Sequence, residues 1–97
     1  MVNDKIIDYR QSYYDFLENA KKVRESLQNT INSLEDARSS MKNAYVVNEE
    51  TPYDEYLLET IENKKNIYNS LTYTIIPAIE DKIDKISLEM DAFDSLI

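Results

Sequence analysis

The chain has no glycine among its 97 residues, and this absence limits its fold more than any other feature. Glycine is the usual residue where the backbone needs a positive φ or comes close to a ligand, as in tight hairpin turns and phosphate-binding loops. Only two prolines interrupt the chain, and cysteine, histidine and tryptophan are absent. A chain of this composition is expected to be all-α, with very few turns.

Apolar residues in the first half of the chain recur at alternating spacings of three and four, with Thr30 as the polar exception. This heptad pattern predicts a long helix over about residues 4–46, with one side packed against a partner helix as in a coiled coil. The residues expected on this seam are Ile6, Tyr9, Tyr13, Phe16, Ala20, Val23, Leu27, Thr30, Leu34, Ala37, Met41 and Ala44.

The pattern stops at about residues 47–51, where we expect a turn. Thr51 is a candidate N-cap, and Pro52 follows at the first helical position, where its missing N–H costs nothing. Asp54 lies three residues after the cap and approximates a capping box. These signals predict a second helix over about residues 52–95.

The second helix has two heptad phases that differ by one residue. The first phase holds Leu57, Ile61, Lys64, Tyr68, Leu71 and Ile75, and the second holds Ile79, Ile83, Ile86, Met90, Phe93 and Ile97. Pro77 lies between them and removes a helical hydrogen bond, so the helix is expected to kink there. The alternative is a break into two helices at Ile76. Folding at the turn gives an antiparallel coiled-coil hairpin in which Ala20 is expected to face Pro77.

The charge balance is acidic, with 19 Asp and Glu against 11 Lys and Arg and a net charge of −8. Such a chain is repelled by nucleic acid and by anionic lipid surfaces. No apolar run is long enough to span a bilayer, and the first residues lack the pattern of a secretory signal peptide. We expect a cytoplasmic protein, or one exported without a cleaved signal. The second half holds ten of the acids and four of the bases, which suggests either simple solubility or a basic partner.

The sequence offers little for catalysis. Histidine is absent, so the most common general base is missing, and a metal site could use only carboxylates. We therefore predict no enzyme activity, no cofactor and no metal.

Additional apolar residues lie outside the expected seam, and a two-helix hairpin cannot bury them. Scattered surface apolar residues are normal, but these cluster, and the core of a hairpin is thin. We therefore predict a helical protein partner, either another chain or a second copy. The candidate partner-binding residues are Ile7, Tyr14, Leu17, Ile31, Leu58, Ile67 and Leu88.

In size, acidity and expected shape, the chain resembles the WXG-like small helical proteins of type VII secretion, and more closely the accessory proteins of LXG-type toxins in Gram-positive bacteria. The Trp-x-Gly turn is absent, and the turn here runs from Val47 to Pro52. The C-terminal export motif is also missing, because the spacing at Met90–Asp94 lacks its tyrosine. The resemblance implies a non-enzymatic chaperone-like partner that binds the helical N-terminal region of a toxin and helps its export.

The alternative function is a self-associating coiled-coil scaffold or adaptor, built as an antiparallel four-helix homodimer. The two functions differ in an observable way. A secretion partner should need a second protein for stability, whereas a scaffold should be a stable homodimer alone.

Overall fold

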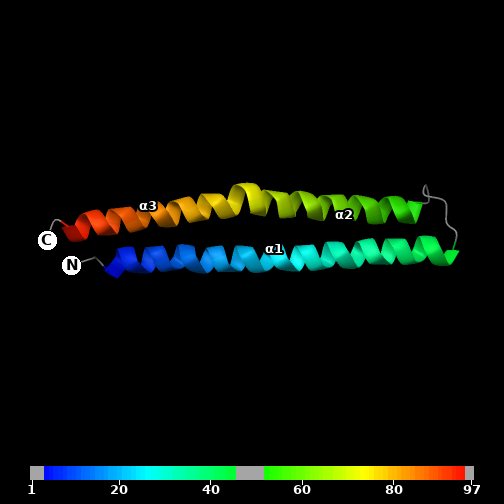
Figure 1. The fold of residues 1–97 in the computed structure, drawn as a ribbon, viewed down its shortest axis with the longest axis horizontal. Helices are drawn as coiled ribbons and strands as arrows, with labels where there is room; N and C mark the ends of the chain where they lie inside the picture. Colours follow the sequence, from blue (N-terminus) through cyan, green and yellow to red (C-terminus); the bar gives the residue numbers. More distant parts are fainter. Residues whose placement is uncertain (1–3, 46–51, 96–97) are drawn as a thin grey trace.

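The computed structural model describes residues 4–45 and 52–95, and all of them are helical. Helix α1 (Asp4–Tyr45) runs antiparallel to a second rod made of α2 (Pro52–Ser70), the π-helical turn η1 (Leu71–Ile75) and α3 (Ile76–Ser95) (Figure 1). The molecule measures 73 × 15 × 14 Å. The predicted all-α antiparallel hairpin is therefore confirmed. The expected turn at 47–51, including the Thr51 cap, lies outside the described residues.

Local interactions favour the helical form of both rods. Asp4 in the first turn of α1 and Lys42 in its last turn oppose the partial charges of the helix ends. Asp54 and Glu55 do the same at the start of α2. The ion pair of Lys85 with Asp81, 2.9 Å across one turn of α3, adds a small helical support.

The phase change in the second rod takes the form of a π-helical turn. The N–H of Ile76 donates to the carbonyl of Leu71, five residues back, so the turn accommodates one extra residue. Leu71 and Ile76 are consequently both buried, whereas Ile75 is 37% exposed. The shift matches the one-residue phase change in the sequence, but Ile76 and not Ile75 takes the seam position. The alternative of a break into two separate helices at Ile76 is wrong, because helical turns run without interruption from α2 through η1 into α3.

The kink near Pro77 stays a prediction. The observed irregularity is η1, which ends two residues before the proline. Pro77 is exposed, whereas Ala20 is buried in a cluster with Leu71 and Ile76. The expectation that Ala20 faces Pro77 is therefore wrong, and Ala20 packs against the residues that flank the π turn. The other members of this core cluster are Ile79 and Ile83, with Tyr13, Leu17 and Leu27 packed against it.

Helix α1 is rotated relative to its predicted orientation. Half of the expected seam is present, because one heptad line is buried or half-buried as predicted: Ile6, Tyr13, Ala20, Leu27, Leu34 and Met41. The second buried line of α1 lies four residues after each of these residues, whereas the sequence prediction placed it three residues after them. Its members, all buried or half-buried, are Arg10, Leu17, Arg24, Ile31 and Arg38.

This rotation corrects five predicted seam residues of α1. The exposed residues are Tyr9, Phe16, Val23, Thr30 and Ala37, because they lie on the line that turns away from the second rod. Phe93 is also exposed, in the last turns of α3. Of the other predicted seam residues of the second rod, Ile75 is exposed, Lys64 and Tyr68 are half-buried, and Ile97 lies outside the described residues. The buried ones are Leu57, Ile61, Leu71, Ile79, Ile83, Ile86 and Met90.

Polar side-chain contacts between described residues of the two rods set their register. Near the open end of the hairpin, Nη1 of Arg10 donates to Oγ of Ser87 at 3.4 Å. Farther along, Nζ of Lys65 lies 2.8 Å from Oε1 of Glu35. Close to the connection between α1 and α2, Arg38 binds Asp54. These contacts place residue 10 of α1 level with residue 87 of α3.

Candidate functional site

The predicted partner-binding residues fall into two groups. Ile7, Tyr14, Leu58, Ile67 and Leu88 are exposed, as a partner surface requires. Leu17 and Ile31 belong to the seam instead, and their assignment to a partner surface is wrong. Leu17 packs against the core cluster, and Ile31 is 3% exposed. The rotation of α1 explains both errors.

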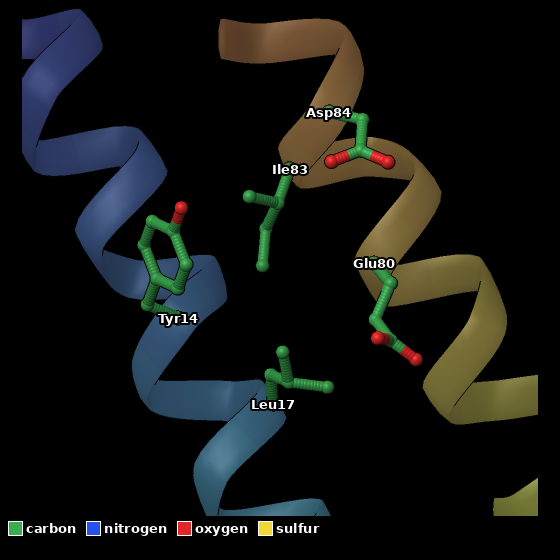
Figure 2. Close-up of a pocket in the computed structure, with 5 residues that line it drawn as sticks. All are labelled: Tyr14, Leu17, Glu80, Ile83 and Asp84. Atoms are coloured by element: carbon green, nitrogen blue, oxygen red, sulfur yellow. The ribbon is translucent and has the colours of Figure 1, made fainter.

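Tyr14 lies at a hollow between α1 and α3. This hollow has a volume of about 170 Å³, and its lining includes Leu17 and Ile83. Figure 2 shows these two side chains pointing into the space between the helices, with the Tyr14 ring beside them. We call this surface, together with Ile7 two turns earlier, the Tyr14 patch. It combines an apolar floor from the core with an aromatic side chain that is 44% exposed.

Carboxylates surround the Tyr14 patch. Glu80 and Asp84 of α3 line the same hollow (Figure 2). On the other side of Tyr14, a second depression of about 380 Å³ includes Asp15 and Glu18 together with the basic residue Lys21. Glu18 pairs with Lys22 at 3.7 Å, an exposed contact that leaves the carboxylate open to water. An apolar surface with an acidic rim is suited to an amphipathic helix with Lys or Arg beside its apolar stripe.

The opposite side of α1 carries a second apolar surface. Tyr9, Phe16 and Val23 follow one another at intervals of seven residues, so they lie on one line of the helix. All three are exposed, Phe16 at 55%. We call this line the aromatic flank. A depression of about 350 Å³ lies on it, lined by Tyr9, Ser12, Tyr13 and Phe16.

Two tyrosines of this surface interact closely. The rings of Tyr9 and Tyr13 meet edge to face, with centroids 5.1 Å apart, and their hydroxyl oxygens are 3.2 Å apart. This hydrogen bond raises the pKa of Tyr13 above its ordinary value, and partial burial of the phenol adds to the rise. The pair presents two adjoining aromatic rings on the aromatic flank.

The aromatic flank as a surface was missed by the sequence prediction, which placed its residues in the seam. The spacing of the arginines in α1 was a signal that could have indicated which line faces the second rod. Arg10, Arg24 and Arg38 recur every fourteen residues on the line that the structure buries. Long arginine side chains can cover an apolar seam with their methylenes while the charged group reaches water.

Among the described residues, neither a metal-binding cluster nor a membrane-spanning helix is present. No group of three or more Asp, Glu, His or Cys side chains among them could hold a metal ion. Within the same residues, none of the helices combines the length and apolarity that crossing a membrane requires.

Comparisons with known proteins give no match. No family model, no curated protein and no solved structure matches this chain. The two exposed surfaces of the hairpin are therefore the basis for inferring its function.

Proposed function

We propose that this chain is a non-enzymatic helical partner protein that binds the helical N-terminal region of an LXG-type toxin and assists its type VII export. The observation that supports this role is the Tyr14 patch, an apolar surface between acidic side chains on a long helical hairpin. Exposed aromatic side chains beside an apolar floor are typical of protein interfaces. The resemblance in size, acidity and expected shape to the accessory proteins of LXG-type toxins is what suggests this class of partner.

The chemistry of the patch describes the helix that it would bind. Ile7 and Tyr14 lie seven residues apart, about 10 Å along α1, so they match an apolar stripe of two heptad repeats. Glu80 and Asp84 stand beside this stripe and select Lys or Arg on the partner helix. Such charges mainly speed association and reject acidic competitors, and apolar burial supplies most of the affinity.

Mixing the two proteins tests the proposal. The purified chain would be combined with the N-terminal helical region of an LXG-type toxin encoded beside it, and the mass of the complex measured by light scattering after gel filtration. We expect a stoichiometric complex whose association slows as salt is raised, because the acidic rim is exposed. The variant Ile7→Glu/Tyr14→Glu should lose the complex and keep its helicity, since neither side chain is buried in the seam.

A matched control separates this patch from the rest of α1. Phe16→Glu changes an equally exposed aromatic residue two positions away and should leave toxin binding unchanged. Binding that survives Ile7→Glu/Tyr14→Glu would remove the patch from the interface. If wild type forms no complex with the toxin region, the proposed function is wrong.

A further inference from the structure

The hairpin buries the less apolar of two possible lines on α1. Arg10 and Arg24 lie against the second rod, while Tyr9, Phe16 and Val23 remain at the surface. Along this flank of α1, ten positions from Tyr9 onward are uncharged, although the chain has a net charge of −8 and Lys5 precedes Tyr9 by one turn. These positions are Tyr9, Ser12, Phe16, Asn19, Val23, Ser26, Thr30, Ser33, Ala37 and Ser40. The part of this flank that holds the exposed rings of Tyr9 and Phe16 is the part that resembles the centre of an interface.

The neighbouring side of α3 carries two charges without counter-ions. The side of α3 next to the Tyr14 patch carries Glu80, Asp84 and Ser87. Around the axis of α3, Lys82 and Glu89 lie about half a turn from these residues, so they lie beside the aromatic flank. The charge of Lys82 acts on the Tyr13 hydroxyl, which agrees with this placement. Among the described residues, neither Lys82 nor Glu89 makes an ion pair.

The unpaired charges and the aromatic residues share one centre. Tyr9 and Phe16 are seven residues apart, with their midpoint between residues 12 and 13 of α1. Lys82 and Glu89 are also seven residues apart, with their midpoint between residues 85 and 86 of α3. Because Arg10 lies level with Ser87, these midpoints fall at the same height along the hairpin, within about one residue rise of 1.5 Å.

We propose that a second copy of this chain packs on the aromatic flank, antiparallel to the first, with the two-fold axis beside Ser12 and Tyr13. A two-fold axis at this height brings Phe16 of each copy onto Tyr9 of the other. The same rotation brings Lys82 of each copy to Glu89 of the other. The surface is self-complementary in both apolar shape and charge, as a two-fold interface must be.

The depression on the aromatic flank fits this arrangement. Its lining residues Tyr9, Ser12, Tyr13 and Phe16 are centred on the proposed axis. Phe93 of one copy lies level with Ala78 of the other under the same rotation, so a large side chain meets a small exposed one. Because the axis passes through the depression, the depressions of the two copies face each other, and Phe93 is the large side chain that meets a small one.

The area is sufficient for a specific dimer. The overlap covers residues 4–21 of α1 and the matching length of α3, about 27 Å at 1.5 Å per residue. Two adjacent helices are about 20 Å wide, so each copy contributes about 500 Å² and the pair about 1,000 Å². That total lies at the lower limit for specific interfaces, which predicts a reversible dimer.

Charge distribution favours this face over the other. Glu80 and Asp84 line the opposite flank, so the dimer turns them outward, whereas Asp8 lies one turn before Ser12 at the edge of the interface. Beyond the overlap, which ends at residue 21, the same side of α1 carries Val23 outside the dimer and then becomes small and polar at Ser26, Ser33 and Ser40. The dimer does not require toxin binding, because the Tyr14 patch lies on the opposite flank.

Sedimentation velocity of the chain alone, at increasing concentrations, tests the dimer. Wild type should shift from 11.4 kDa toward twice that mass as concentration rises into the micromolar range. Phe16→Glu should remain monomeric throughout. Tyr14→Glu is the matched control, a similar exposed aromatic on the other flank, and should dimerise as wild type does. Circular dichroism should show equal helicity in all three proteins.

A charge exchange tests the position of the axis. Lys82→Glu alone and Glu89→Lys alone each place two like-charge pairs in the dimer, and each should weaken it at least about tenfold. The double variant Lys82→Glu/Glu89→Lys should restore most of the wild-type affinity, because every pair is again of opposite sign.

Three results would overturn the proposal. The first is that the wild-type protein stays monomeric at every concentration. This includes the case in which only a different protein covers the aromatic flank. The second is a dimer that Tyr14→Glu abolishes and Phe16→Glu leaves intact. The third is a charge exchange that does not restore a dimer weakened by the single reversals.

Discussion

Arg38 of α1 holds both carboxylate oxygens of Asp54 in the first turn of α2. Its Nε donates to Oδ1 at 2.6 Å, and its Nη2 donates to Oδ2 at 3.1 Å. Asp54 is only 7% exposed, so this forked contact is largely shielded from water. It joins the two rods close to their connection. The hydrogen bonds from Arg38 also lower the pKa of Asp54 below its ordinary value.

This lowered pKa predicts a loss of stability in acid. The unfolded chain takes up a proton on Asp54 at a higher pH than the folded chain does. The stabilisation is therefore complete above the ordinary pKa of aspartate and is lost as the pH falls through the lower, folded value. Urea unfolding followed by circular dichroism from about pH 6 to pH 2 should show a falling midpoint. Asp54→Asn should start lower and fall less, and the exposed control Asp36→Asn should follow wild type.

The π-helical turn predicts unequal roles for two adjacent isoleucines. Ile76 is 3% exposed, so Ile76→Ala should lower the free energy of unfolding by about 2–5 kcal/mol. Ile75→Ala should cost less than about 1 kcal/mol, because that side chain is partly in water. Chemical denaturation at low protein concentration measures both. A larger loss for Ile75→Ala would mean that the second rod is a regular α-helix through this region.

The rotation of α1 is tested by a second pair of substitutions. Ile31→Ala removes a buried seam residue and should cost about 2–5 kcal/mol. Val23→Ala shortens an exposed side chain, and its effect should lie within about 0.5 kcal/mol. The same denaturation measurement compares them. The reverse order would restore the orientation in which Val23 lies on the seam.

Ala20 predicts the effect of added bulk beside the π turn. It is buried among Leu71, Ile76 and Ile79, so Ala20→Leu should overpack the cluster and cost about 1–3 kcal/mol. Ala37→Leu adds the same atoms at an exposed position of α1 and serves as the control. A stabilised Ala20→Leu variant would show unfilled space between the rods at this level.

Much of the fold was predictable because it depends on local chemistry. The absence of glycine and the heptad spacing predict two helices, and the change of phase after Leu71 predicts an irregularity in the second rod. The form of that irregularity was not predictable from proline alone. Pro77 disfavours a regular α-helix at residue 73, but the burial of Leu71 and Ile76 together selects a π turn as the solution.

The orientation of α1 could not be obtained from hydrophobicity. The line with Tyr9, Phe16 and Val23 is more apolar than the line with Arg10 and Arg24, and apolar content was the only criterion available. Cross-rod contacts such as Arg10 with Ser87 and Arg38 with Asp54 favour the second line. They join residues far apart in sequence, so spacing within one helix does not predict them. The Tyr14 patch was only partly predicted, since its acidic rim comes from α3.

The extra residue within η1 also affects which length changes the hairpin can tolerate. A related chain with one residue fewer between positions 71 and 75 could keep the apolar residues of α2 and α3 on the same side of its second rod, because the π turn would become an α-helical turn. Such a chain would be expected to replace Pro77 as well, because a proline in an uninterrupted helix crowds the carbonyl four residues before it. A deletion elsewhere in the second rod would rotate the residues on one side of it by about 100° around the helix axis relative to the rest, and would expose their apolar side. Single-residue gaps among related sequences should therefore collect at this turn.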